Sequence, residues 1–520
     1  MSKKIRTRFA PSPTGMMHIG NFRTALYTFL FARHTGGIFI LRIEDTDQQR
    51  YVEGAAETIF KNLRWAGIEW DEGIEKGGEY GPYVQSERKD IYKIYADDLV
   101  KKGHAYYCFC SKERLEEMRK GQESRHDAPR YDGTCRNLSP DEVERKLAAG
   151  EPYVIRQKMP SEGEVLFDDL VFGKITVNAG ELEDQILMKS DGLPTYNFAN
   201  VVDDHLMEIT HVIRGSEYLS STPKFNLLYE AFGWEKPTYI HLPVLTDEQH
   251  RKLSKRQGDV AMDDFIKKGY TKEAIVNYVA LLGWNPGTEK EIFSMDELIN
   301  EFSVEKIHKN PAVFDYKKLN WLNGQYLRKM PLEEFYKFVE KFYTPPAPPC
   351  KGGDNVSSRA EQSEAEGSVA HTQIPPLAPT SLGRNDKFMK ISKLLHERVE
   401  VPADIPEMID FLFALPDYDI SLHTHKKMKT DPEIARRVLQ QTLKLFTEIS
   451  AWNEENIKNV LYKECEDMGL KTGQVMWPVR VALSGKEFTP GGAIEIADIL
   501  GREESLRRLE VGIDKLRDSL

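Results

Sequence analysis

The beginning of the chain alternates between short apolar segments and an amphipathic one. Residues 4–10, KIRTRFA, alternate in character and end in PSPTG, which predicts a strand because proline blocks its continuation. Apolar side chains then recur at helical intervals from Phe22 to Arg33, and Gly36-Gly37 ends that helix. The nearly all-apolar IFILRIED predicts a buried parallel strand. Strand, helix and strand in this order predict a doubly wound, Rossmann-type α/β domain with a parallel sheet.

The remainder of the chain divides into segments with different patterns. Amphipathic helices are predicted over 53–65 and 90–102, whereas 106–190 is dominated by short strands and turns. The strand-and-helix pattern resumes at LPTYNFANVVDDHLMEITHVIRG, and almost every segment after Ala261 is helical. We therefore predict an α/β domain in two halves (1–105 and 191–260), an inserted α+β domain (106–190), a helical region (261–325) and an all-α C-terminal region (326–520).

One stretch of the helical half has no apolar period. Residues 344–386 are rich in Pro, Ser, Gly and Glu. Such a segment buries too little apolar surface to offset the entropy lost on ordering. We expect it to be disordered or to form an excursion on the surface.

Composition narrows the class of protein. The 520 residues carry 71 Lys and Arg against 82 Asp and Glu, a formal net charge of −11. This balance excludes a protein that coats nucleic acid through bulk charge, although it permits a local basic face, and we expect no DNA partner. The sequence contains no apolar run of membrane-span length and no signal-peptide pattern, and its five cysteines are too few for a disulfide framework. We expect a globular protein of the cytoplasm without a membrane partner.

The first candidate for chemistry is the loop after the first predicted strand. PSPTG is followed by His18, Ile19, Gly20 and Asn21 at the start of a predicted helix. Gly20 permits close approach to the backbone, and a helix N-terminus attracts phosphate through its N–H groups and dipole. The residues alone leave open that Asn21 only caps the helix and that His18 is a surface residue.

The second candidate is the basic segment from Lys252 to Arg256, KLSKR, with Gly258 after it. Its cations could surround a polyphosphate and offset negative charge that builds up at the α-phosphate. A basic pentapeptide alone could equally be a solvated loop. Because both motifs flank the same predicted sheet, we expect them to converge at one edge of it.

These motifs resemble the two signatures of class I aminoacyl-tRNA synthetases, PSPTGMMHIGN the first and KLSKR the second. RFAPSPTG, LRIEDTD and DGLPTYNFANVVDDHLMEITHVIRG, with TGQVMWPVRVALSGKEFTP and GGAIEIADILG near the end, resemble the bacterial glutamyl-tRNA synthetases over most of the chain. The resemblance implies ATP-dependent ligation of L-glutamate to tRNA(Glu) through a glutamyl-adenylate, by a monomer. Whether tRNA(Gln) is also a substrate stays open.

The resemblance implies a glutamate pocket at the carboxyl edge of the sheet. Arg8 ends the first predicted strand and Glu44 follows the second. By family analogy Arg8 meets the side-chain carboxylate, for which a bidentate guanidinium is suited, and Glu44 holds the ammonium. The residues alone leave open that Glu44 and Arg42 form a surface ion pair and that Tyr196 is a core residue. The other pocket residues that the resemblance implies are Ser12, Tyr196, Asn200 and Arg214.

The resemblance also implies an ATP site. It assigns His18 and Gly20 to the adenosine and phosphates, Glu217 and Leu242 to the nucleoside, and Lys252, Ser254 and Lys255 to the phosphates. The reaction needs no protein nucleophile, so catalysis rests on positioning and charge stabilisation, with Mg²⁺ on the phosphates. The predicted catalytic residues are His18, Gly20, Lys252 and Lys255, with the largest single effect at Lys255.

Three cysteines of the inserted domain raise the question of zinc. Cys108, Cys110 and Cys135 resemble the zinc site of some relatives, in which a histidine follows the last cysteine by two residues; here Asn137 occupies that position. A tetrahedral zinc site needs a fourth ligand, for which His126 and Tyr131 are alternatives. We expect no zinc, and name no metal ligand.

The resemblance assigns the inserted domain to the tRNA acceptor stem, the region 261–325 to further stem contacts, and the helical half to the anticodon. Arg436, Arg437, Arg480 and Trp477 suit contacts to phosphates and unstacked bases. Alternative interpretations are a glutaminyl-type synthetase, whose pocket must prefer a neutral amide, and a non-catalytic tRNA-binding synthetase paralogue. A shortened relative that modifies a tRNA base lacks the helical half, and a small-molecule adenylyltransferase has no use for it.

Overall fold

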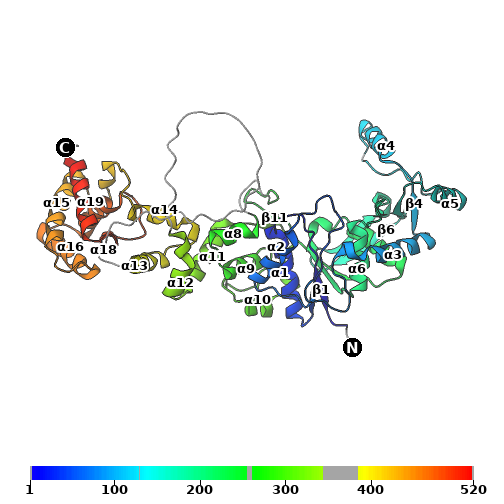
Figure 1. The fold of residues 1–520 in the computed structure, drawn as a ribbon, viewed down its shortest axis with the longest axis horizontal. Coiled ribbons are helices and arrows are strands. Elements are labelled where there is room, and N and C mark those ends of the chain that lie inside the picture. Colours follow the sequence, from blue (N-terminus) through cyan, green and yellow to red (C-terminus); the bar gives the residue numbers. More distant parts are fainter. Residues whose placement is uncertain (1–2, 128, 254–259, 344–383, 518–520) are drawn as a thin grey trace. The chain divides into compact units, whose positions relative to one another are not determined.

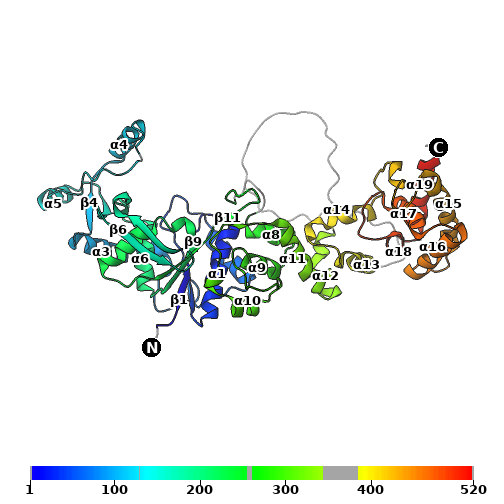
Figure 2. The ribbon, with the colours of Figure 1, turned by 180° about the vertical axis from the view of Figure 1, so that it is seen from behind.

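The computed structural model of the chain describes residues 3–127, 129–253, 260–343 and 384–517. The chain folds into two compact units, drawn in Figures 1 and 2. The first comprises Met1–Lys267 with Lys272–Leu319, and the second Lys268–Thr271 with Asn320–Leu520.

The first unit begins with the predicted strand, helix and strand. β1 (Arg6–Phe9) pairs in parallel with β2 (Ile38–Leu41), and β2 pairs in parallel with β3 (Glu72–Gly73). Helix α1 (Ile19–His34) packs against β1 and β2 and buries its apolar side chains, while α2 (Ala55–Trp65) follows β2. Both strands are almost entirely buried, as expected of parallel strands that are covered on both faces. The predicted α/β class with a parallel sheet is confirmed.

A second sheet has the order β7-β6-β10-β9. β9 (His211–Gly215) and β10 (Thr238–Leu242) are parallel, and β6 (Glu164–Asp169) is parallel to β10 and antiparallel to β7 (Gly173–Asn178). The two sheets meet where the backbone N–H of Thr210 donates to the carbonyl of Arg6 at 3.0 Å. Helices α6 (Tyr196–Leu206) and α7 (Thr222–Phe232) lie between these strands in the sequence.

The residues predicted as an insert, 106–190, are divided between two sheets. β4 (Ala105–Cys108), β5 (Val154–Gln157) and β8 (Ile186–Met188) form an antiparallel sheet, whereas β6 and β7 belong to the sheet of β9 and β10. The segment also contains α4 (Lys112–Ser124) and α5 (Pro140–Ala148), where the sequence pattern indicated only short strands and turns. Neither helix has a fully buried residue, and their apolar stripes are short: Leu115 and Met118 on α4, and Val143 and Leu147 on α5.

Helices complete the first unit. α3 (Lys89–Lys101) precedes β4. β11 (Leu245–Thr246) pairs with β12 (Ala312–Val313). Between these two strands in the sequence lie α8 (Met262–Lys268), α9 (Lys272–Ala280) and α10 (Met295–Glu301). The boundary between the units falls inside α11 (Tyr316–Lys329).

The second unit is built from helices around one apolar core, which confirms the predicted all-α region. Of the predicted excursion 344–386, residues 344–383 lie outside the described residues, and 384–386 belong to the first turn of α13. No described helix is both long and apolar enough to span a membrane. The helices longer than one turn are α12 (Leu332–Val339), α13 (Arg384–His396), α14 (Ile405–Ile409), α15 (Pro432–Glu448), α16 (Glu454–Met468), α17 (Thr472–Ser484), α18 (Ala493–Leu500) and α19 (Arg502–Arg517).

Candidate active site

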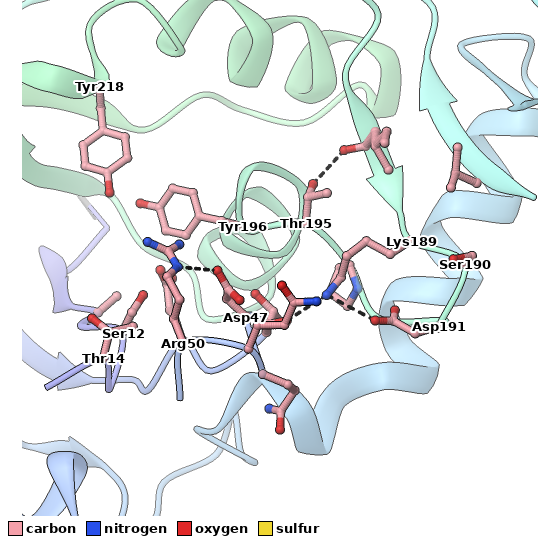
Figure 3. Close-up of a pocket in the computed structure, with 18 of the residues that line it drawn as sticks. Ser12, Thr14, Asp47, Arg50, Lys189, Ser190, Asp191, Thr195, Tyr196 and Tyr218 are labelled. Atoms are coloured by element: carbon pink, nitrogen blue, oxygen red, sulfur yellow. Dashed lines mark hydrogen bonds and ion pairs between the residues drawn. The ribbon is translucent and has the colours of Figure 1, made fainter. Parts of the chain in front are cut away.

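A cavity of about 1060 Å³ opens in the first unit where β1, β2 and β9 end and α6 begins. This is the carboxyl edge at which parallel α/β sheets bind ligands. The predicted site residues that line it are Arg8, Ser12, Glu44, Tyr196, Arg214 and Glu217. Figure 3 shows part of its lining, with Tyr196 and Tyr218 beside each other and Ser12 and Thr14 below them.

Buried ion pairs hold the base of the cavity. Arg8 donates through Nε to Asp204 at 3.0 and 3.2 Å, and Arg42 bonds to the same carboxylate at 2.9 Å. Arg42 also donates to Glu44 at 2.8 Å. Burial is the largest influence on Asp204 and opposes ionisation, but the two guanidinium groups hold the pKa of its carboxyl below the usual value. Arg42 and Glu44 therefore do pair, but as a buried bridge with 0% and 1% side-chain exposure and not as a surface pair.

Glu44 has one oxygen in this network and one outside it. Oε1 accepts from Arg42 and, at 3.3 Å, from the amide of Gln85. Oε2 is buried, and within the described residues no donor reaches it. Burial raises the pKa of Glu44 to about 7, although Arg42 acts in the opposite direction. Since a buried acceptor without a donor is costly, Oε2 is suited to a donor that a ligand brings.

Arg214 stands across the cavity without a carboxylate partner among the described residues. Its Nε donates to the ring of His241 at 3.1 Å, and its Nη2 donates to the hydroxyl of Thr222 at 2.7 Å. The guanidinium carbon lies 5.3 Å from the ring centroid of Tyr218 and 4.7 Å from that of Phe225. The cation is thus oriented by neutral groups, and its charge is left for a ligand.

Tyr196 and Asn200 lie one turn apart on α6, but the structure uses them differently. Tyr196 lines the cavity, with its ring centroid 5.5 Å from that of Tyr218. Burial raises the pKa of Tyr196, so its hydroxyl stays protonated. Asn200 is buried outside the cavity lining, and its amide donates to the carbonyl of Tyr196 at 3.0 Å. Tyr196 is therefore not the core residue that the sequence left open, whereas Asn200 lies behind the wall.

The histidine turn forms the start of α1. His18, and not Asn21, is the N-cap, and its Nδ1 accepts from the backbone N–H of Gly20 at 3.1 Å. His18 and Gly20 are outside the cavity lining, but Asn21 and Thr24 on the first turns of α1 belong to it. The helix N-terminus therefore lies beside the cavity, as a phosphate site requires.

The KLSKR motif (residues 252–256), named the lysine loop, is attached to this turn through residues that follow it and to β11 through its first residue, Lys252. After the loop, the backbone N–H of Ile19 donates to Val260 at 2.8 Å, and His18 pairs with Ala261. At the start of the loop, Lys252 pairs with Thr246 on β11. Ser254 and Lys255 lie outside the described residues. Leu242 is fully buried on β10 and, like Lys252, is outside the cavity lining.

Several lining residues carry charge that the motif analysis did not assign. Lys189 donates to the carbonyl of Thr46 at 2.9 Å and lies 3.4 Å from Asp191, and Arg50 pairs with Asp47 at 2.6 Å (Figure 3). Asp204, which lies outside the lining but pairs with Arg8 and Arg42, was also missed. Its position one helical turn after Asn200 on α6 was a signal that could have revealed it.

The three cysteines of the insert cluster at the far side of the same cavity. The sulfur atoms of Cys108, Cys110 and Cys135 lie within 4.8 Å of one another, and Cys108 and Cys110 contribute to the lining. Of the two alternatives for a fourth ligand, Tyr131 is present, with its hydroxyl 3.3 Å from Cys108 Sγ and 3.6 Å from Cys110 Sγ. Three thiols fit three corners of a tetrahedral zinc site. The expected absence of zinc stays a prediction.

In the second unit, two of the residues predicted to contact RNA, Arg480 and Trp477, contact each other. The Arg480 guanidinium lies 4.4 Å from the ring centroid of Trp477 and donates to Thr489 at 2.9 Å, which secures the loop that presents Phe488. Phe488 is 81% exposed. Arg436 is half-buried and Arg437 is exposed on α15.

The chain is similar to known proteins along nearly its whole length. Residues 4–321 match the family model described as "tRNA synthetases class I (E and Q), catalytic domain", and residues 369–513 match "Anticodon binding domain". The glutamate--tRNA ligase of Clostridium acetobutylicum is 53% identical over 99% of both chains, and that of Clostridium novyi is 51% identical over 100% of this chain and 99% of its own.

Solved structures give the same result. A glutamate tRNA ligase from Elizabethkingia meningosepticum, crystallised in complex with its amino acid, aligns with a TM-score of 0.80 at 38% identity, covering 99% of this chain and 100% of its own. The glutamate-tRNA synthetase from Elizabethkingia anophelis aligns with a TM-score of 0.82 at 37% identity, covering 98% and 100%.

Proposed function

The chain belongs to the class I tRNA synthetases for glutamate and glutamine, and we propose that it ligates L-glutamate to tRNA(Glu) at the expense of ATP. The observation that carries the choice of amino acid is the charge of the residues at the base of the cavity, where Arg8, Glu44 and Arg214 lie. Arg8 and Arg42 are balanced by Asp204 and Glu44, whereas Arg214 meets no carboxylate among the described residues. This surplus cation suits glutamate, which carries one net negative charge, better than neutral glutamine.

The hydrogen-bond donors and acceptors around the cavity also match those of the substrate. The unpartnered Oε2 of Glu44 would accept from the ammonium, and the guanidinium groups of Arg8 and Arg214 would each face a carboxylate. Ser12 and Tyr196 offer hydroxyl groups from the wall between them. Asn200 would act from behind, by fixing the first turn of α6 under Tyr196.

The reaction proceeds in two substitutions. A carboxylate oxygen of glutamate attacks the α-phosphorus of ATP, and the bond to pyrophosphate breaks. A terminal ribose hydroxyl of the tRNA then attacks the mixed anhydride and AMP leaves. We assign the phosphates and Mg²⁺ of ATP to the α1 N-terminus and the lysine loop, with His18, Gly20, Lys252, Ser254 and Lys255, and the nucleoside to the neighbourhood of Glu217 and Leu242.

The tRNA extends the proposal to the rest of the chain. The match to an anticodon-binding model supports contact between the second unit and the anticodon, and we assign the acceptor stem to the residues predicted as an insert. Action in the cytoplasm, as a monomer, completes the proposal.

Charging assays test the proposal. Purified enzyme is incubated with ATP, Mg²⁺ and labelled L-glutamate, and with tRNA(Glu) or tRNA(Gln) side by side. We expect glutamyl-tRNA(Glu) to form, and the second tRNA decides whether the enzyme also charges tRNA(Gln). Labelled glutamine, which should not be transferred, is the matched control. Transfer of glutamine in preference to glutamate, or no transfer of either, would refute the proposal.

A further inference from the structure

Two buried residues that no motif assigns lie next to Arg214: His241 accepts a hydrogen bond from it, and Asp169 accepts one from the ring of His241. Strand pairing places all three on adjacent strands, because β10 pairs His241 with Arg214 of β9 and Tyr239 with Asp169 of β6. The side chains of Asp169 and His241 are both fully buried. Asp169 also lies in the segment that the sequence assigned to the insert, so this contact joins that segment to the cavity.

The hydrogen bonds define the protonation of each group. Asp169 accepts four N–H groups: two at Oδ1, from Val171 and Phe172, and two at Oδ2, from the backbone and ring of His241. The ring contact, between Nδ1 and Oδ2, is 2.7 Å long. A carboxylate in this setting only accepts, so Nδ1 carries the proton. Nε2 of the neutral ring is then an acceptor, and Arg214 donates to it through Nε at 3.1 Å.

Neutral partners also hold the rest of the guanidinium. Nη2 donates to the Thr222 hydroxyl, which in turn donates a hydrogen bond to the carbonyl of Tyr218 at 2.9 Å. The rings of Tyr218, Phe225 and Tyr239 surround the group. A carboxylate in place of His241 would also orient Arg214, but it would cancel the charge that the substrate needs. A neutral acceptor orients the cation and leaves its charge intact.

We propose that His241 and Asp169 are positioning residues for glutamate: Asp169 fixes the tautomer of His241, and His241 fixes the plane of the Arg214 guanidinium against a substrate carboxylate. The inference rests on the proposed role of Arg214 in glutamate binding. Its physical basis is preorganisation, since a donor that is already oriented loses little freedom when the substrate binds. Neither residue lines the cavity, so both act through Arg214.

Two substitutions at one position separate orientation from packing. In His241→Gln, the amide oxygen can take the place of Nε2 and accept from Arg214. His241→Asn reaches only the Nδ1 position, so it keeps the bond to Asp169 and loses the bond to Arg214. Asp169→Asn presents an amide N–H to Nδ1, which favours the other tautomer and leaves two donors facing each other. His211→Asn, on β9 outside the cavity lining, is the matched control.

The measurement is the KM for L-glutamate and for ATP in charging of tRNA(Glu) by the full-length enzyme. We expect His241→Asn and Asp169→Asn to raise the KM for glutamate about tenfold to a hundredfold, the worth of a hydrogen bond to a charged group. The KM for ATP should stay unchanged, and His241→Gln and His211→Asn should resemble the wild type. An unchanged KM for glutamate in His241→Asn, or an equal rise in both KM values, would overturn the positioning role.

Two further measurements keep the test decisive. In the NMR spectrum of the wild-type enzyme labelled with ¹⁵N-histidine, the resonance of His241 is the one that is missing from the spectrum of His241→Gln. We expect this resonance to report a proton on Nδ1. A proton on Nε2 would overturn the inference, and this result does not depend on the activity of any variant. Arg214→Ala separates the inference from the proposed function. If Arg214→Ala leaves the KM for glutamate unchanged, the assignment of Arg214 to glutamate fails; if it raises the KM while His241→Asn does not, only the positioning role fails.

Discussion

At the scale of single residues, the candidate site depends on charges that are buried together. Asp204 serves both Arg8 and Arg42, and all three side chains are almost completely buried. Taking a charge out of water is costly, and only close partners offset the cost. The same ion pairs therefore stabilise the fold around the site and set the charge of the site. A substitution at one of these positions should change both the free energy of unfolding and the binding of the substrate.

Asp204→Asn tests this dependence. The substitution leaves two buried guanidinium groups facing an amide, and loss of one partner of a buried ion pair costs about 3–5 kcal/mol. We expect the unfolding of the first unit in urea to shift by that free energy. Asp98→Asn removes the exposed pair with Lys102 and should cost less than about 1 kcal/mol. Equal effects of the two variants would show that the buried network does not stabilise the unit.

The proposed contact between Glu44 and the ammonium of glutamate predicts how the binding of glutamate depends on pH. Burial raises the pKa of this carboxyl to about 7, so the group is neutral below that pH and charged above it. Only the charged form pairs with the ammonium, so the KM for glutamate should fall as the pH rises through about 7. Steady-state charging from pH 6 to 8 measures it.

Glu44→Gln should remove this pH dependence and raise the KM for glutamate at pH 8 by about tenfold or more. Glu69→Gln, at an exposed residue paired with Lys76, is the control and should retain the wild-type profile. A glutamate KM that is flat with pH in the wild type would contradict the assignment of Glu44 to the ammonium.

At the scale of elements, the sequence predicted what depends on local pattern and missed what depends on tertiary pairing. β1, α1 and β2 follow apolar periods, and the family resemblance assigned Arg8, Ser12 and Glu44, near the ends of the two strands, to a pocket whose cavity they line. α4 and α5 carry only short apolar stripes and bury no residue fully, so they were missed, although Ser139 and Glu142 form a capping box.

Contacts between residues that are far apart in the sequence could not be predicted either. Asp204 meets Arg8 across 196 positions, and His241 meets Asp169 across 72. Such pairs arise from the order of strands in a sheet, which no local pattern contains. The resemblance also assigned Asn200 to the glutamate pocket and Leu242 to the neighbourhood of the nucleoside; both are buried and outside the cavity lining, and their roles stay predictions.

Gly20→Ala tests the phosphate role of the α1 N-terminus separately from its stability. A Cβ at this position would lie 3.4 Å from Nδ1 of His18 and 4.0 Å from Leu245, so the fold can accept it. Alanine in a helix is more stable than glycine by about 0.5–1 kcal/mol. We expect an unchanged or raised melting temperature together with a higher KM for ATP. An unchanged KM for ATP would remove Gly20 from the ATP site.

At the scale of the whole molecule, the proposal assigns the chemistry and the recognition of the anticodon to separate units. The cavity and the catalytic-domain match lie in the first, and the anticodon-binding match lies in the second. Changes in the second unit should therefore alter the KM for tRNA and leave the KM values for glutamate and ATP as they are.

Phe488→Ala is a direct test of this division. The ring is 81% exposed on a loop that Arg480 secures, and an aromatic ring that stacks on a nucleic-acid base is worth about 1–3 kcal/mol. We expect a higher KM for tRNA(Glu), with the KM for glutamate unchanged. A change in the KM for glutamate, or no change in the KM for tRNA, would contradict this assignment of Phe488.

We propose that glutamate and ATP react side by side at the cavity, next to the N-terminus of α1. Exchange of labelled pyrophosphate into ATP, measured with and without tRNA(Glu), tests it most directly because exchange requires reversible formation of the adenylate. We predict exchange that needs L-glutamate, that glutamine does not support, and that Lys255→Ala lowers by orders of magnitude at saturating ATP. Exchange supported equally by glutamine, or unaffected by Lys255→Ala, would contradict the account.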